Sequence, residues 1–350
     1  MYSIDELNTF DDEKLVQVDW KNITQLNGRL LELHAEGALN NEFLAKLPLP
    51  PILCIDQIER IDDDEIRATF TFPDDVKDWA FDKTESLEML FQDQLDQLVG
   101  FWGCRKADGI GRALSSSACT LHQSLDFVAG KTIQFYLKKR KWVANKNEGG
   151  TAVFNGQILD ANDALILETK NVIVGILAPA DINALRQKFG GTLGVTPDAD
   201  KPNYSALNLR IPLYDKDSID TQTEDNNITV MNATQKINPE LWPLKFHFRG
   251  DPVVPGNFGT HGMIALLKEA AKTHFGLQTP IFKSMSNKKF SGMIFEDPKQ
   301  IRFELKDISK NENGEIVAAM ASLFLEHDNG SAMIEDPIYT FKNLTVTESA

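Results

Sequence analysis

His247 is the residue of this 350-residue chain best placed to move a proton. It precedes a loop rich in glycine and proline, which leads into an apolar segment of helical periodicity. Histidine exchanges a proton readily near neutral pH, and the first turn of a helix offers free N–H groups to developing negative charge. Gly256 ends the loop, and its missing side chain would let a substrate carbonyl approach the backbone. A lone histidine is more often a structural residue than a catalytic one.

The sequence around His247 reads INPELWPLKFHFRGDPVVPG, over residues 237–256. It resembles the active-site loop of the bacterial beta-hydroxydecanoyl-ACP dehydratase/isomerase family, in which Asn-Pro-Asp-Leu-Trp, His-Phe and Gly-Asp-Pro-x-x-Pro-Gly occur in that order. The resemblance implies that His247 abstracts the α-proton of a 3-hydroxyacyl thioester, and it outweighs the structural interpretation of this histidine.

The second half of the chain lacks the carboxylate of that family. The family carries an acid fourteen residues after its histidine, on the central helix, but His261 stands at that position here. No Asp or Glu lies between Pro252 and Lys268. The second half therefore has the base without the acid.

The first half contains the missing carboxylate. DQLDQLVGF, at residues 93–101, resembles the family's helix, in which Gln-Leu-Val-Gly-Phe begins four residues after the acid. The resemblance implies that Asp93 is the general acid and that Gln97 orients this acid or a water molecule. The segment GRAL at 111–114 matches a Gly-Arg-Ala-Leu that follows the helix in the same family.

The two defects are complementary. The first half has Trp79 where its histidine would stand, and GDPxxPG is absent there. In the family, the active site lies across a dimer interface, with the histidine from one hotdog and the carboxylate from the other. The resemblance thus implies an α+β double hotdog with one working site, built from His247 and Asp93. The paired halves also resemble the dehydratase regions of polyunsaturated fatty acid synthases and other megasynthases.

The elements that would position these residues occur twice. Apolar residues at three- and four-residue steps predict buried helices at about 84–104 and 258–274. Alternating segments predict strands at 52–61, 65–72, 117–127 and 131–144, a hairpin over 151–177 with its turn at 162–163, and strands again at 299–308, 315–328 and 331–342. We expect a helical segment (1–47), a first hotdog (48–178), a linker (179–208) and a second hotdog (209–345). The two hotdogs should share one antiparallel sheet around the two helices.

Composition excludes several classes of protein. The net charge of −15 argues against nucleic-acid binding, which requires basic surfaces. No apolar run reaches the length of a membrane span, and the acidic N-terminus does not resemble a signal peptide, so we expect a cytoplasmic protein. The three cysteines have no metal-site spacing, and we expect neither a metal nor a bound cofactor.

One basic stretch interrupts the acidic sequence. Its core is formed by Lys138, Lys139, Arg140 and Lys141. We name these four residues the basic stripe. An anionic partner would dock there, and an acyl carrier protein, whose phosphopantetheine arm would carry the substrate, fits. The alternative is a solvated strand edge whose lysines discourage pairing.

The sequence leaves other functions open. Because each half has lost part of a site, the chain could be a non-catalytic module that binds acyl carriers. A hotdog thioesterase is a third possibility, although it would not need the GDPxxPG loop. The sequence does not decide whether the enzyme also isomerises its product to the cis-3 form, or which acyl chain length it takes.

Overall fold

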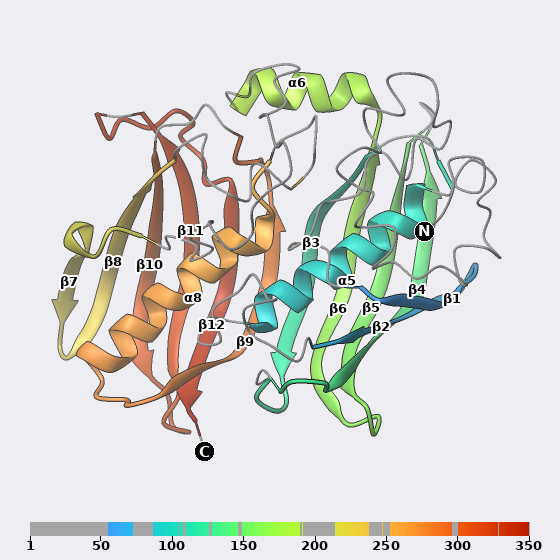
Figure 1. The fold of residues 1–350 in the computed structure, drawn as a ribbon. Coiled ribbons are helices and arrows are strands. Elements are labelled where there is room, and N and C mark those ends of the chain that lie inside the picture. Colours follow the sequence, from blue (N-terminus) through green and yellow to red (C-terminus); the bar gives the residue numbers. More distant parts are fainter. Residues whose placement is uncertain are drawn as a thin grey trace.

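A single sheet of 12 strands, with every neighbouring pair antiparallel, carries two long helices on one face (Figure 1). The computed structural model describes residues 55–72, 87–104, 106–107, 110–125, 128–145, 149–189, 191, 214–237, 247, 253–295, 300–327 and 329–349. The helical segment expected at 1–47 lies outside these ranges. No helix within them is long and apolar enough to cross a lipid bilayer.

The chain forms two units of the same design. The first has helix α5 (Leu87–Cys104) and strands β1 (Gln57–Ile61), β2 (Glu65–Thr71), β3 (Ile110–Leu121), β4 (Thr132–Ala144), β5 (Gly150–Asp160) and β6 (Leu165–Leu177). The second has helix α8 (Gly256–Thr273) and strands β7 (Asp220–Glu224), β8 (Asn227–Lys236), β9 (Pro280–Phe290), β10 (Gln300–Lys310), β11 (Ile316–Glu326) and β12 (Tyr339–Glu348). A short 3-10 helix, η2 (Lys216–Ser218), precedes β7.

The strand order makes the duplication explicit. From one edge of the sheet the order is β1-β2-β4-β5-β6-β3, and from the other edge it is β7-β8-β10-β11-β12-β9. The units meet where β3 pairs with β9, with Ser116 opposite Lys288 and Ala118 opposite Ser286. Each unit is a hotdog fold, a sheet that packs around one central helix. The chain is therefore an α+β double hotdog with one continuous sheet, as predicted.

A small hydrogen-bond motif repeats in both units. In the first, the Ser117 hydroxyl donates to the carbonyl of the residue before Asn171 (3.0 Å), and the Asn171 amide donates back to Ser117 (3.1 Å). Ser286 and Asn343 make the same two bonds in the second unit, at 3.0 and 3.3 Å. Both asparagines have φ of 49°, which asparagine tolerates better than most residues. The motif fixes the correspondence of β3 with β9, Ser117 matching Ser286.

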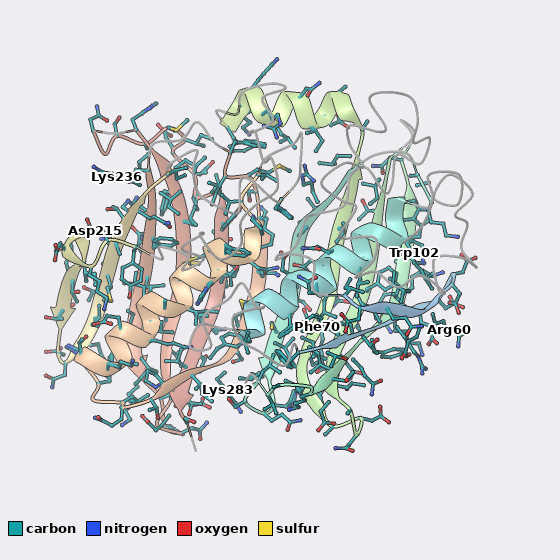
Figure 2. All side chains as sticks on the ribbon, in the orientation of Figure 1. Arg60, Phe70, Trp102, Asp215, Lys236 and Lys283 are labelled. Atoms are coloured by element: carbon teal, nitrogen blue, oxygen red, sulfur yellow. The ribbon has the colours of Figure 1, made fainter. Side chains whose placement is uncertain are left out.

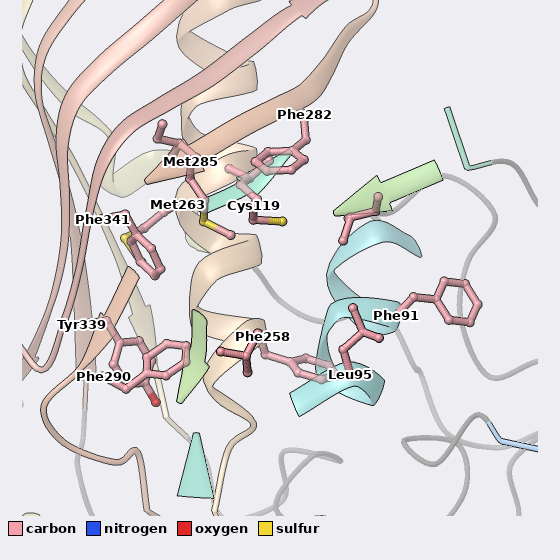
Figure 3. Packing of buried hydrophobic residues seen from close by; sticks show 14 of the residues in the cluster. Phe91, Leu95, Cys119, Phe258, Met263, Phe282, Met285, Phe290, Tyr339 and Phe341 are labelled. Carbon is pink, nitrogen blue, oxygen red and sulfur yellow. The ribbon is translucent and has the colours of Figure 1, made fainter. Parts of the chain in front are cut away.

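Apolar residues fill the space between the helices and the sheet. Alternate residues of β4 are buried, which places Ile133 and Phe135 beneath α5. The Phe91 ring of α5 lies 5.8 Å from that of Phe135. From the first turn of α8, Phe258 points toward α5 near Leu95 (Figure 3). The two central helices thus contact each other as well as the sheet.

Part of the expected linker is a helix. Helix α6 (Pro179–Phe189) lies at one end of the sheet (Figure 1), and the rest of 179–208 falls outside the described residues except Gly191. Its buried residues Ile182, Arg186 and Phe189 recur at helical spacing. The Arg186 guanidinium lies 4.6 Å from the centre of the Phe295 ring, so α6 packs on the second unit.

The strand predictions were incomplete in the second half. Strand β9 was not predicted, and it is the strand that joins the two units. Strand β12 begins at Tyr339, later than the expected start at 331. In the first half, β3 begins at Ile110 and therefore includes the GRAL segment. The predicted turn at 162–163 is confirmed, with Asp163 at φ 62° between β5 and β6.

Candidate active site

His247 is held against the loop that leads into α8. It is buried, its Nδ1 lies 3.0 Å from the carbonyl oxygen of Val253, and the Val253 N–H donates to the carbonyl of His247 (2.8 Å). A carbonyl only accepts, so Nδ1 carries the proton of the neutral ring. The lone pair is then on Nε2, the form in which an imidazole acts as a base. Most other residues of the motif, 238–246 and 248–252, lie outside the described residues.

Helix α8 begins three residues after Val253. Pro255 is its N-cap, no side chain caps the helix, and Gly256 is the first helical residue. A β-carbon at Gly256 would lie 2.9 Å from Cζ of Phe290, so glycine is needed for this packing. The sequence led us to expect glycine here for a different reason, the close approach of a substrate carbonyl, and that reason stays a prediction. The Gly256 N–H belongs to the first turn, where backbone N–H groups have no partner in the preceding turn.

Asp93 lies on α5 with 4% of its surface exposed. Its Oδ2 accepts a hydrogen bond from Gln97 Nε2 at 2.5 Å, across one turn of the helix. Its Oδ1 accepts from Asn257 Nδ2 at 3.2 Å, and Asn257 is the second residue of α8. The carboxyl group of the first unit is therefore bound by a residue at the helix terminus of the second.

The environment of Asp93 suits a proton donor. Burial, and next the neighbouring charge of Asp96, raise the pKa of Asp93 to about 7. Hydrogen bonds from Gln97 and Asn257, and the charge of Lys288, act in the opposite direction. A carboxyl with this pKa is populated in both protonation states near neutral pH, as a general acid requires.

Asn257 also connects Asp93 to a buried ion pair that the sequence analysis did not foresee. Its Nδ2 donates to Asp96 Oδ2 at 2.9 Å, and its Oδ1 accepts from Lys288 Nζ at 3.0 Å. Lys288 Nζ lies 3.2 Å from Asp96 Oδ2. The sequence places Asp96 three residues after Asp93, one helical turn away, so their proximity could have been predicted. Lys288 could not be placed, because it lies on β9, which was not predicted.

Tyr339 borders the same carboxyl group. Its ring is buried, and it packs edge-on against Phe290 with 4.6 Å between the ring centroids. Burial, and then the charge of Asp93, hold the pKa of the Tyr339 phenol well above its usual range. The phenol therefore keeps its proton near neutral pH.

The mirror position in the second unit is occupied by His261. It is 5% exposed, and burial, followed by the charge of Lys268, lowers its pKa to about 3. His261 is therefore neutral near pH 7, whereas Asp93 is populated in both protonation states there. Trp79, which stands where the histidine of the first unit would be, lies outside the described residues.

His247 and Asp93, from opposite units, thus both contact the segment around the start of α8. His247 binds the backbone just before α8, and Asp93 binds a side chain in the first turn of α8. Figure 1 shows that the N-terminal ends of α5 and α8 lie close to the boundary between the units. Within the described part of the chain, no group of three or more His, Cys, Asp or Glu side chains is arranged to hold a metal ion.

The basic stripe lies on β4, two strands from the edge strand β1, which carries Arg60, and on the side of the molecule where Figure 2 also labels Trp102 of α5. Lys139 is half-buried, forms an ion pair with Asp64 (3.2 Å) and lies 5.4 Å from the Trp102 ring centre. The other three side chains, those of Lys138, Arg140 and Lys141, are exposed. Lys139 thus has a structural role, and docking stays a prediction for the other three.

The comparison with known proteins adds one family match. Residues 217–331 match the family described as the FabA-like domain. This range begins in η2 and ends after β11, so it contains His247, α8 and β9. The second unit is therefore similar to this family.

Several solved structures match this chain at low identity. The dehydratase-cyclase domain from ambruticin biosynthesis matches with 12% identity and a TM-score of 0.42, over 85% of this chain and 95% of the other. A dehydratase of the borrelidin and fluvirucin polyketide synthases matches with 10% identity and a TM-score of 0.40, over 88% and 98%. An acyl-ACP thioesterase from Bacteroides thetaiotaomicron matches with 12% identity and a TM-score of 0.42, over 80% and 97%.

Proposed function

We propose that this chain dehydrates 3-hydroxyacyl thioesters to trans-2-enoyl thioesters at one composite site. The observation that carries the proposal is the contact of Asp93 with Asn257 in the first turn of α8, next to the segment that holds His247. A base and a carboxyl of raised pKa then serve one substrate from two units. The FabA-like match of residues 217–331 supports the same reaction class.

The base in this proposal is Nε2 of His247. It removes a proton from C2 of the substrate, and the electron pair of that C–H bond forms the C2–C3 double bond as the C3–O bond breaks. Negative charge that builds on the thioester oxygen is stabilised by the N–H of Gly256 and by the helix terminus.

The acid is Asp93 in its protonated form. It transfers its proton to the departing hydroxyl group, which leaves as water. The step ends with an imidazolium at His247 and a carboxylate at Asp93, and the next turnover requires a proton to return from one to the other. Gln97, bound to Oδ2, holds the carboxyl group in one orientation.

We propose an acyl carrier protein as the partner, with the substrate on its phosphopantetheine arm and no other cofactor. The chain would work beside the other domains of a megasynthase, of the polyunsaturated fatty acid synthase type. An aspartate in the acid position resembles the isomerising branch of the family, so migration of the double bond to cis-3 is a second step to assay.

The test is a turnover assay of the full chain with 3-hydroxyacyl pantetheine thioesters. The ultraviolet absorbance of a conjugated enoyl thioester should appear without release of free thiol. Release of thiol would identify a thioesterase instead. Binding of an acylated carrier without any turnover would support the non-catalytic alternative. The His247→Ala variant serves as the blank.

A further inference from the structure

Polar side chains from both units surround the carboxyl group of Asp93. Asp96 belongs to α5, Asn257 to α8 and Lys288 to β9, and they are 6%, 1% and 2% exposed. Burial of an ion pair costs desolvation energy that the attraction between the charges often only offsets. Stability alone therefore does not explain why these charges lie in the core.

Lys288 fixes the orientation of the Asn257 amide. An ammonium can only donate hydrogen bonds, so the amide oxygen must face Lys288 Nζ (3.0 Å). The amide nitrogen then faces the two carboxylates, with 3.2 Å to Asp93 Oδ1 and 2.9 Å to Asp96 Oδ2. Because Gln97 binds Oδ2 of Asp93, both oxygens of that carboxyl group are held.

The arrangement occurs at one of the two mirror-related positions only. The repeated serine motif matches Ser286 with Ser117, so Lys288 corresponds to Cys119. The match of Asp93 with His261 places Ile264 at the position of Asp96. Neither counterpart is charged. The charges of Asp96 and Lys288 are thus present at one of the two corresponding places only, as is the carboxylate itself, since His261 stands at the position of Asp93.

We propose that Asn257, Asp96 and Lys288 are positioning residues, which orient the Asp93 carboxyl group and set the pH range in which it keeps its proton. This inference rests on the proposed function for the role of Asp93 as the acid. Lys288 acts through Asn257 and Asp96, and Asp96 acts on Asp93 as a neighbouring negative charge.

Variants of the groups that face Asp93 should shift the pH at which it releases its proton, in opposite directions. The charged or titratable groups are Asp96 on its own helix, Lys288 on β9 and Tyr339 on β12. Loss of the Asp96 charge should make Asp93 release its proton at lower pH. Loss of the Asn257 hydrogen bond, which favours the ionised form, should make it release the proton at higher pH.

The experiment measures the titration of Asp93 directly. Infrared difference spectra between each protein and its Asp93→Asn version follow the carboxyl band against pH and need no substrate. Relative to wild type, the midpoint should move down by about one pH unit in Asp96→Asn, and up in Asn257→Ala. The charge-neutral double variant Asp96→Asn/Lys288→Met should move down by less than Asp96→Asn alone, because the effect of Asp96 on Asp93 exceeds that of Lys288.

Cys119→Ala, at the mirror position of Lys288, is the matched control and should leave the midpoint unchanged. Shifts of the predicted signs support the positioning role, and the alkaline limb of kcat/KM should follow them. Equal midpoints in all variants, with only a lower melting temperature, would overturn it and leave a purely structural network. Absence of dehydratase activity would refute the proposed function without affecting the infrared test.

Discussion

The side-chain amide of Asn257, in the second hotdog, donates a hydrogen bond of 3.2 Å to the carboxyl group of Asp93, in the first. Each residue lies on the central helix of its own unit. The environment of the candidate acid is therefore completed only when the two units are joined through β3 and β9. A duplicated chain with this contact can lose one histidine and one carboxylate and still retain one complete site.

Loss of either candidate catalytic group should abolish dehydration. His247→Ala removes the base and Asp93→Asn removes the acid, and each should lower kcat by at least about 100-fold. Because the two groups act in one step, the double variant should be scarcely slower than either single variant. Turnover of a 3-hydroxyacyl pantetheine thioester measures all three, with circular dichroism to verify the fold.

His261→Ala is the matched control for this pair. His261 occupies the mirror position of Asp93, but it is buried and neutral near pH 7. Its removal should leave the activity per folded molecule within about twofold of wild type, with some loss of stability from the cavity. A loss as large as that of Asp93→Asn would mean that the second unit has its own site.

Asp93 should make the fold less stable as the pH rises. Its pKa is about 7 in the folded protein and near 3.8 without the fold, so the folded state binds the extra proton between these values. Stability falls as the pH rises through this window, and the loss is complete above pH 7, with an upper limit of about 4 kcal/mol. Urea unfolding at pH 5 and pH 8 should show a smaller decline in Asp93→Asn than in wild type. Parallel declines in both proteins would contradict the raised pKa.

Much of the fold follows from local patterns. The apolar spacing of Leu95, Leu98 and their neighbours predicted α5 within a few residues, and the turn at Asp163 was correct. Gln97 and Asp93 are one helical turn apart, and the structure shows them in contact. Interactions within one element are readable because helix geometry alone brings the residues together.

The unforeseen parts depend on contacts between distant segments. Strand β9 carries several lysines and serines, a composition that resembles a loop, although it lies at the centre of the sheet. Its buried residues Phe282 and Met285 are three positions apart, so the sequence lacks the regular alternation that predicts a strand. The position of Lys288 beside Asp96 depends on the pairing of β9 with β3, which no local pattern encodes. Helix α6 was missed because it lies in a stretch with prolines, glycines and polar residues that is typical of a linker, although Ile182 and Phe189 share one helix face.

Gly111 should be required for the packing of α5 on β3. A β-carbon at Gly111 would lie 2.9 Å from Cα of Gly100, a backbone atom that cannot move without shifting the helix. Gly111→Ala should therefore destabilise the protein by about 2 kcal/mol.

The matched control is the substitution at the other glycine of this contact. Gly100→Ala leaves an ordinary 3.7 Å contact with Gly111 and removes a helical glycine. It should be neutral or stabilising by up to about 1 kcal/mol. Equal thermal denaturation of the two variants would contradict this asymmetry.

Charge reversal in the basic stripe should separate docking from catalysis. Arg140 and Lys141 are exposed, whereas Lys139 is engaged with Asp64 and Trp102, so Arg140→Glu/Lys141→Glu tests the surface without breaking those contacts. Weaker attraction to an acidic carrier protein should lower kcat/KM for the carrier-bound substrate by about 10-fold at low salt, and the difference should shrink as salt screens the charges. Turnover of the pantetheine thioester should stay within about twofold, because that substrate has no acidic protein surface for the stripe to attract. Lys170→Glu, an exposed lysine on β6, provides the control for a general loss of positive charge. Equal losses with both substrates would mean that the stripe stabilises the sheet edge and does not bind the carrier.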